Sequence, residues 1–307
     1  MTAEEKGDGA LERVGLIGHP VAHSRSPAMQ QAALDALGIP ARYALWDTPA
    51  EGLADRVAAL RAPGMLGANV TLPHKLAVIP LLDDLAAEAR RVAGAVNTIV
   101  RVEDAAGRAR LVGHNTDVAG LAATLRAADA WPAGRRVVVL GAGGAAQAVA
   151  GLVADAGAAG LVVAARRVAA AARLLAEVVA RLGARPAEVA ALDLADAGAL
   201  AVALGRCDLL VNTTPVGMGA GDGVRQDAMP IDPAALARLP AEALVLDIVY
   251  TPTETALLRA ARAAGRRTAN GLPMLLRQGA SAFELWTGRP APLAVMRAAL
   301  GLDERSA

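Results

Sequence analysis

The fold is decided by the stretch RRVVVLGAGGAA, residues 135–146. Its β-branched run predicts a buried strand, and the glycines that follow predict a tight turn into a helix of small residues. Residues 141–146 fit the spacing G-x-G-x-x-A, in which small residues let backbone N–H groups approach a pyrophosphate at a helix N-terminus. The run LVVAA, residues 161–165, follows at about the distance of a second Rossmann strand. These features predict a Rossmann dinucleotide-binding domain; the alternative is a glycine turn required only for close helix packing.

The residues at the end of that second strand bear on which nucleotide is bound. NAD sites commonly place an acidic residue there, which binds the ribose hydroxyls. Here the positions are Ala165, Arg166 and Arg167. An arginine can hold a 2′-phosphate with two hydrogen bonds, so the sequence favours NADP (NADPH) over NAD. The alternative is that both arginines are ordinary solvated side chains.

The composition of the 307-residue chain limits its other partners. A net charge of +1 and 2% aromatic residues provide neither the basic surface nor the stacking platform of a nucleic-acid-binding protein. Cys207 is the only cysteine, which excludes an intramolecular disulfide and fits a reducing cytoplasm. The uncharged run 137–154 is nearly long enough to span a membrane, but its glycines favour a strand and a turn. We therefore expect a cytoplasmic protein with no nucleic-acid and no membrane partner.

The length and the order of the expected elements predict two domains. From residue 13 to about 117, strand-like and helix-like runs alternate, with a hairpin expected over 96–113 that turns at 104–107. Such alternation predicts an α/β domain with a mainly parallel sheet, which we assign to the substrate. A Rossmann domain is expected over 118–270, and the chain after Thr251 is mostly helical. Residues 1–12 are polar and acidic, and we expect a disordered tail there rather than a signal peptide.

Polar residues before the glycine turn gather in four short islands. These are HSRSP (23–27), NVTLPHK (69–75), AVNT (95–98) and GHNTD (113–117). Each island follows or ends a strand-like run, and open α/β sheets bind their ligands at such strand ends, so the islands are expected to converge on one cleft. Taken singly, each has a structural explanation: Ser26 and Asp117 as helix caps, and Asn97 and Asn115 as turn residues.

Lysine is rare in this chain, which makes Lys75 a candidate for proton transfer. Of the 31 basic side chains only Lys6 and Lys75 are lysines. Lysine can release a proton, whereas arginine stays protonated up to about pH 12; the alternative is a solvated surface lysine. The histidines His19, His23, His74 and His114 offer a rival metal site. We expect no metal, because Pro20 prevents a helical pairing of the first two and no carboxylate lies at a ligand spacing.

Together these motifs resemble the shikimate dehydrogenase family (shikimate/quinate dehydrogenases). The resemblance runs from residue 14 to about 300 and rests on eight ordered segments: GHPVAHSRSP, GANVTLPHK, AGAVNT, GHNTD, VLGAGGAA, VNTTPVGM, LDIVYTPTET and NGLPMLLRQGASAF. It implies an N-terminal α/β substrate-binding and catalytic domain, 13–117 plus 271–307, a Rossmann NADP-binding domain, 118–270, and an active site in the cleft between them. The implied activity is the NADPH-dependent, reversible reduction of 3-dehydroshikimate to shikimate, in chorismate and aromatic amino-acid biosynthesis.

The resemblance also implies roles for individual residues. Lys75 and Asp117 resemble the family's catalytic pair. The substrate-binding residues would be Ser24, Ser26, Asn69, Thr71, Lys75, Asn97, Asp117, Tyr250 and Gln278, with the two serines and Tyr250 on the carboxylate and the others on the ring. The cofactor-binding residues would be Gly141, Ala142, Gly143, Gly144, Ala145, Arg166, Arg167, Thr213, Thr214, Met218, Ile248, Gly271 and Met274.

Three positions depart from the family pattern. His19 stands where the family usually has Asn, and His74 stands before the lysine where an aromatic residue is common. Ala165 replaces an Asn that is common in NADP-using relatives, and Arg167 and Arg173 are additional arginines that could compensate for it.

The implied chemistry requires a proton donor. Reduction of a carbonyl by hydride leaves an alkoxide, so Lys75 would act as general acid/base while Asp117 orients its ammonium group. The alternatives are an NAD-using quinate/shikimate or aminoshikimate dehydrogenase, although some quinate-preferring relatives carry Thr at the position of Ser26. From a different class, a non-catalytic NADP-sensing regulatory protein would bind the nucleotide without turnover. The protein is expected to be a monomer or a homodimer.

Overall fold

The structure is a computed structural model that describes residues 12–183, 186–219 and 227–302. They divide into two compact units. Of the described residues, unit 1 holds 12–89, 96–116 and 278–302, and unit 2 holds 90–95 and 117–277. The tail expected over 1–12 lies outside the described residues except for Glu12, which is the first residue of a strand.

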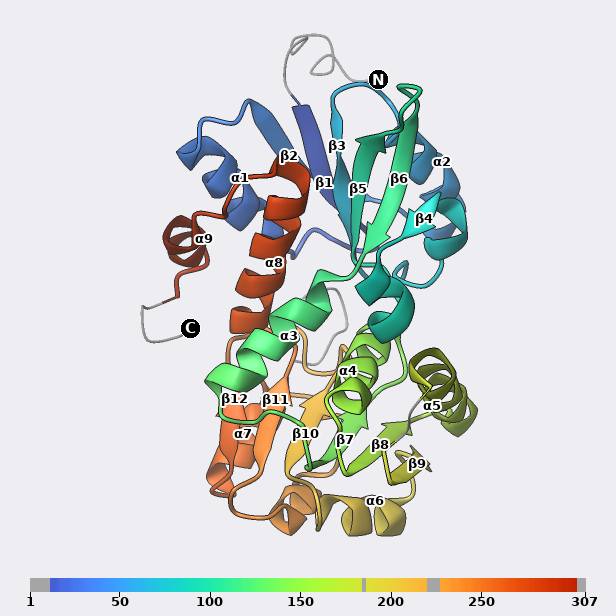
Figure 1. Ribbon diagram of the computed structural model, residues 1–307. Helices are drawn as coiled ribbons and strands as arrows, with labels where there is room; N and C mark the ends of the chain where they lie inside the picture. The colour runs from blue at the N-terminus through green and yellow to red at the C-terminus, as the bar shows by residue number, and fades with distance from the viewer. Residues whose placement is uncertain (1–11, 184–185, 220–226, 303–307) are drawn as a thin grey trace. The chain divides into compact units, whose positions relative to one another are not determined.

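Unit 1 is built on a six-stranded mixed sheet in the order β2-β1-β3-β5-β6-β4 (Figure 1). Its strands are β1 (Glu12–Gly18), β2 (Ala41–Asp47), β3 (Met65–Val70), β4 (Asp84–Leu85), β5 (Thr98–Glu103) and β6 (Ala109–His114). β1 pairs in parallel with β2 and β3, as the alternating sequence predicted. β5 is antiparallel to both β3 and β6, and a hairpin joins it to β6.

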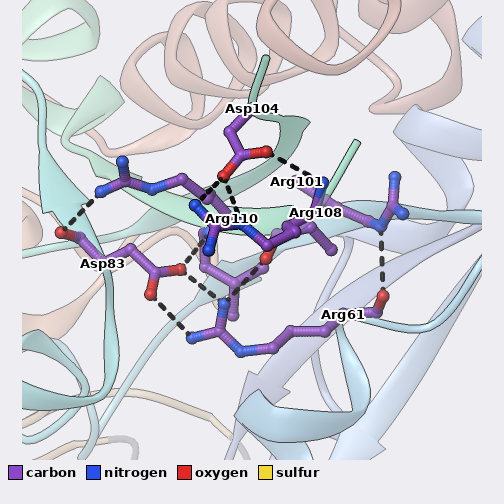
Figure 2. Close-up of polar contacts among 8 residues, drawn as sticks. Arg61, Asp83, Arg101, Asp104, Arg108 and Arg110 are labelled. Atoms are coloured by element: carbon purple, nitrogen blue, oxygen red, sulfur yellow. Dashed lines mark hydrogen bonds and ion pairs between the residues drawn. The ribbon is translucent and has the colours of Figure 1, made fainter. Parts of the chain in front are cut away.

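Polar side chains brace this hairpin at its turn and along one strand (Figure 2). The turn lies where the sequence predicted it: Asp104 accepts hydrogen bonds from the backbone of Arg108 and Ala106, and Gly107 has a φ of +73°. Beside β6, the Asp83 carboxylate accepts from Arg61 at 2.5 and 3.2 Å. The hydrogen bonds from Arg61 lower the pKa of Asp83 below its usual value.

Helices surround the sheet of unit 1 and enclose its core. They are α1 (Ser26–Ala36), η2 (Ala50–Gly52), α2 (Leu53–Ala59), η3 (Ile79–Leu81), most of α8 (Leu272–Thr287) and α9 (Leu293–Ala299), and the π-helical turn η4 (Glu88–Ala93) leads out of the unit. Ile17, Leu60, Ile99 and Leu111 are fully buried between the strands and the α2 side. Burial of this aliphatic surface fixes the strand ends that carry the polar islands.

Unit 2 is an all-parallel sheet in the order β12-β11-β10-β7-β8-β9, which is the Rossmann order (Figure 1). Its strands are β7 (Arg136–Leu140), β8 (Gly160–Ala165), β9 (Glu188–Asp193), β10 (Leu209–Asn212), β11 (Leu244–Asp247) and β12 (Arg267–Ala269). One hydrophobic cluster joins the sheet to α3 (Thr116–Ala127), α4 (Gly144–Asp155) and α5 (Val168–Leu182). A second joins it to α6 (Ala197–Leu204), η5 (Pro233–Arg238) and α7 (Ala256–Ala263). Both faces of the sheet are therefore covered, which explains the uninterrupted apolar strands.

The uncharged run 137–154 is the strand β7, the glycine turn and the helix α4, as its glycines predicted. Across the described part of the chain, no helix is both long enough and apolar enough to cross a membrane.

The division of the chain differs from the expected boundaries at two segments and at Asp117, which belongs to unit 2. Residues 90–95 belong to unit 2, because a Cβ on Gly151 of α4 would lie 1.9 Å from the Val92 carbonyl oxygen: the two backbones touch. Residues 271–277 also belong to unit 2 rather than to unit 1. There, Gly271 packs against the backbone of Ile248, and Met274 joins the hydrophobic cluster under α3 and α4.

Candidate active site

The first polar island forms a loop between β1 and α1. Ser24 donates its backbone N–H to Val21, and its hydroxyl accepts the N–H of Ser26 at 3.2 Å. α1 begins at Ser26 itself, and Arg25 takes the cap position, so the alternative role of Ser26 as a helix cap is wrong. The Arg25 side chain donates a hydrogen bond to the carbonyl of Leu300, near the C-terminal end of unit 1. This hydrogen bond anchors the loop.

Buried amides and hydroxyls form a cluster at the ends of β3, β5 and β6. The Asn97 amide donates to Thr116 Oγ1 at 3.0 Å and to Gln278 Oε1 at 3.3 Å, and its oxygen accepts the Thr116 N–H at 2.7 Å. The Asn69 amide donates to Thr98 Oγ1 at 3.2 Å and to the Asn97 carbonyl. Within unit 1 the structure thus brings together three candidates, Asn69, Asn97 and Gln278, from widely separated parts of the chain.

Tyr43 was not a candidate, yet it fixes one of these amides. Its buried phenol donates to Asn69 Oδ1 at 2.8 Å, so the Asn69 amide nitrogen must face Thr98. The ring of Tyr43 packs beside that of Trp286, with centroids 6.2 Å apart. Only two tyrosines occur in the chain, and this scarcity was the available signal.

Lys75 follows β3 on a turn held by the residue before it. His74 is buried, and its Nε2 lies 2.6 Å from the Thr48 carbonyl oxygen. A buried ring therefore occupies the position where the family often has an aromatic residue. Lys75 is half-buried, and its carbonyl accepts the Val96 N–H. Thr71, which starts this turn, is also half-buried.

Asp117 lies in the first turn of α3 and is buried. A carboxylate is favoured at that end of a helix by the helix dipole. Two of the histidines lie beside different carboxylates: His19 pairs with Asp47, and His114 Nδ1 lies 3.0 Å from Glu88 Oε1. That hydrogen bond lowers the pKa of Glu88. Among residues the structure describes, no three His, Cys, Asp or Glu side chains form a group that could hold a metal ion.

The glycine turn of unit 2 is shaped for close approach. Gly141 has a φ of +108°, and a Cβ there would lie 2.6 Å from Thr213 Oγ1, which itself donates to the Leu140 carbonyl. Gly143 is the N-cap of α4, and a Cβ on it would meet nothing within 4 Å. Thr213 therefore packs against one side of the turn, and the other side is open at the N-terminus of a twelve-residue helix. A helix N-terminus of this kind suits an anionic group.

The arginines follow β8. Ala165 ends the strand and is buried, whereas Arg166, Arg167 and Arg173 are exposed. Their guanidinium groups can therefore reach a ligand from solvent.

The remaining candidates of unit 2 follow β10, β11 and β12, on loops except for Met274, which lies in the first turn of α8. Thr213, Thr214 and Met218 follow β10, Ile248 and Tyr250 follow β11, and Gly271 and Met274 follow β12. A Cβ on Gly271 would be 2.1 Å from the Ile248 carbonyl oxygen, so these last two loops are in backbone contact.

Two buried polar residues at these strand ends were not candidates. Asn212 ends β10 and Asp247 ends β11, both with no exposed surface, and Asn212 Nδ2 donates to Asp247 Oδ1 at 2.9 Å. Burial raises the pKa of Asp247 to about 6, against hydrogen bonds from Thr255, Val249 and Asn212. A charged residue at the end of the apolar run LVLD was the available signal.

Family models match two segments of the chain, and relatives align with nearly all of it. Residues 16–99 match the family model described as the shikimate dehydrogenase substrate binding domain, and residues 271–300 match the shikimate 5′-dehydrogenase C-terminal domain. A relative from Symbiobacterium thermophilum named shikimate dehydrogenase (NADP(+)) is 45% identical over 93% of this chain and 92% of its own.

Solved structures agree with these relatives. The shikimate 5-dehydrogenase of Thermus thermophilus, in complex with NADP(H) and shikimate, aligns with a TM-score of 0.76 at 38% identity, over 94% of this chain and 98% of that one. The quinate dehydrogenase of Corynebacterium glutamicum, in complex with NAD, aligns with a TM-score of 0.78 at 34% identity, over 94% and 98%. Sequence identity at this level over nearly the full length, together with a matching fold, indicates common ancestry. The chain belongs to the shikimate dehydrogenase family.

Proposed function

We propose that this protein catalyses the NADP-dependent, reversible reduction of 3-dehydroshikimate to shikimate. The observation that carries the proposal is the buried cluster of Asn69, Asn97 and Gln278 at the strand ends of unit 1. Amides at such positions can donate to and accept from the vicinal hydroxyls of a polyhydroxylated ring. The names of the relatives, shikimate dehydrogenase (NADP(+)), support this substrate and cofactor.

The chain's own residues fit a dinucleotide. Gly141, Ala142, Gly143, Gly144 and Ala145 would receive the pyrophosphate, because the turn carries no side chain larger than a methyl group and opens at the N-terminus of α4. Arg166 and Arg167 would hold a 2′-phosphate, and exposed arginines after β8 favour NADP over NAD. The nicotinamide would be bordered by Thr213, Thr214, Met218, Ile248 and Gly271 on their loops and by Met274 at the start of α8. When bound, the nicotinamide ring supplies or accepts the hydride.

The substrate would be held by its carboxylate and its ring hydroxyls. Ser24 and Ser26, with Tyr250, would bind the carboxylate, and Asn69, Thr71, Asn97, Asp117 and Gln278 would bind the ring. Ser26 heads α1 with no capping role of its own, which leaves its hydroxyl for a ligand.

Lys75 would move the proton. In reduction its ammonium group donates to the carbonyl oxygen as negative charge develops there, and in oxidation its neutral amine accepts the hydroxyl proton. Asp117 would orient Lys75 and bind a substrate hydroxyl. A buried His74 behind the turn restrains the backbone from which Lys75 extends.

A quinate/shikimate dehydrogenase that uses NAD is the second candidate, since the quinate dehydrogenase of Corynebacterium glutamicum aligns over nearly the whole chain. Ser26 rather than Thr, and arginines rather than an acidic residue after β8, favour the first. We place the enzyme in the cytoplasm, as a monomer or homodimer.

One experiment separates these functions. Purified protein is assayed at the NADPH absorbance band with shikimate or quinate and with NADP⁺ or NAD⁺. Rapid absorbance increase with shikimate and NADP⁺, and at least tenfold lower kcat/KM for the other three pairs, is expected. Faster turnover of quinate with NAD⁺ would support the second candidate, and nucleotide binding without turnover of any pair would support a sensor.

A further inference from the structure

Asp247 and Asn212 lie side by side at the ends of two neighbouring strands of unit 2. They are register partners in the parallel pair β10–β11, and both side chains are fully buried. A carboxylate at such a place costs free energy that an aliphatic residue would not, because it leaves water for the protein interior. The raised pKa of Asp247, about 6, reflects that cost. Strand packing alone therefore does not account for an aspartate at this position.

The Asp247 carboxylate ties down both ends of the loop that follows it. Its Oδ1 accepts the Val249 N–H at 3.1 Å, and its Oδ2 accepts the Thr255 hydroxyl at 2.7 Å. Thr255 is the N-cap of α7, and its oxygen accepts the Leu258 N–H at 3.3 Å. The loop between these two anchors carries Tyr250.

Asn212 shapes the neighbouring loop in the same way. Because its amide nitrogen faces the carboxylate of Asp247, its oxygen faces Thr214, whose N–H and hydroxyl donate at 3.0 and 2.8 Å. The Thr214 hydroxyl in turn accepts the Val216 N–H at 3.3 Å. A backbone hydrogen bond from Gly219 to the Thr251 carbonyl, 2.7 Å, then joins the two loops directly.

We propose that Asp247 and Asn212 are positioning residues for catalysis: through Thr255 and Thr214 they set the geometry of loops 213–219 and 248–255. The inference rests on the proposed function, since those loops carry the residues assigned to the cofactor, Thr213, Thr214 and Met218, and to the substrate carboxylate, Tyr250. Neither Asp247 nor Asn212 would touch a ligand. Their effect is to hold the contacting groups in place before the ligands bind.

The test compares Asp247→Ala with Val245→Ala, which removes a buried side chain two residues earlier on the same strand. Both variants lose core contacts, but only the first releases the loops. Steady-state kinetics are measured well below each melting temperature, with folding checked by circular dichroism. For Asp247→Ala we expect KM for NADP⁺ and for shikimate to rise and kcat/KM to fall roughly 10- to 100-fold, as for loss of two or three hydrogen bonds. Val245→Ala should keep wild-type constants, and equal kinetics in the two variants would overturn the proposal.

A milder pair keeps the test decisive if Asp247→Ala does not fold. Thr255→Val removes the hydroxyl that reaches Asp247, whereas Thr255→Ser retains it. We expect raised KM values in the valine variant and near wild-type values in the serine variant; equal values in both would contradict the proposal. Calorimetric titration with NADP⁺ separates this outcome from failure of the proposed function. A wild-type protein that binds NADP⁺ but does not oxidise shikimate refutes the function, while weaker NADP⁺ binding by Thr255→Val still supports the positioning role.

Discussion

The substitution Asp247→Asn makes the buried carboxylate neutral while keeping its shape. The amide oxygen can still accept from Asn212 and Val249, so the strand ends should keep their arrangement. The asparagine side chain, unlike the carboxyl group of Asp247, does not bind or release a proton in this pH range. The fold raises the pKa of Asp247 from 3.8 to about 6, chiefly because burial disfavours the charged form.

The sign and size of the effect follow from that rise. A carboxyl group with a raised pKa binds its proton more tightly in the folded protein than in the unfolded chain. Its contribution to stability is therefore full below about pH 4 and is lost as the pH rises through about 6. Each tenfold difference in proton affinity corresponds to about 1.4 kcal/mol, and the rise covers roughly two powers of ten, so the loss is about 3 kcal/mol.

The measurement is urea denaturation of the wild type and of Asp247→Asn at several pH values between 4 and 8, followed by far-ultraviolet circular dichroism. The free energy of unfolding of the variant minus that of the wild type should increase with pH by about 3 kcal/mol and level off above pH 7. Titration of all other groups cancels in this difference. A difference that stays constant, or that falls with rising pH, would refute the account of a carboxyl destabilised by burial.

Three further substitutions test other parts of the structure. Tyr43→Phe leaves the buried oxygen of Asn69 without its phenol donor, and we expect a loss of about 1–2 kcal/mol in unfolding free energy together with a higher KM for shikimate. Gly151→Ala places a Cβ 1.9 Å from a backbone carbonyl oxygen and should cost at least 1–3 kcal/mol, whereas Gly198→Ala, whose nearest neighbour would be 3.5 Å away, should not destabilise; thermal denaturation of both checks this. Arg166→Ala should raise KM for NADP⁺ roughly 10- to 100-fold and leave KM for NAD⁺ nearly unchanged, and an equal effect on both cofactors would argue against a 2′-phosphate contact.

The sequence was sufficient where structure depends on residues close together in the chain. The strand, turn and helix of 135–146 follow from a β-branched run and its glycines, and the parallel pairing of the strands follows from the alternation of strands and helices. The hairpin of β5 and β6 was likewise marked by Asp104 and Gly107. These features are set by local backbone preferences.

Contacts between distant segments could not be predicted in this way. The assignment of 90–95 to unit 2 depends on Val92 meeting Gly151, and nothing in either segment specifies the other. The role of Ser26 as a cap was wrong because a one-residue shift in the start of a helix changes which residue is the cap. The hydrogen bond from Tyr43 to Asn69 joins the side chains of two strands of one sheet. The sequence gives the identity of these two residues but not the contact between them.

The central claim is that Lys75 transfers the proton in shikimate oxidation, and turnover of Lys75→Arg tests it most directly. Arginine keeps the positive charge but does not release its proton near neutral pH, so kcat should remain about 10²- to 10⁴-fold below the wild type, as in Lys75→Ala, while NADP⁺ binds with unchanged affinity. Wild-type turnover in the arginine variant would contradict the claim.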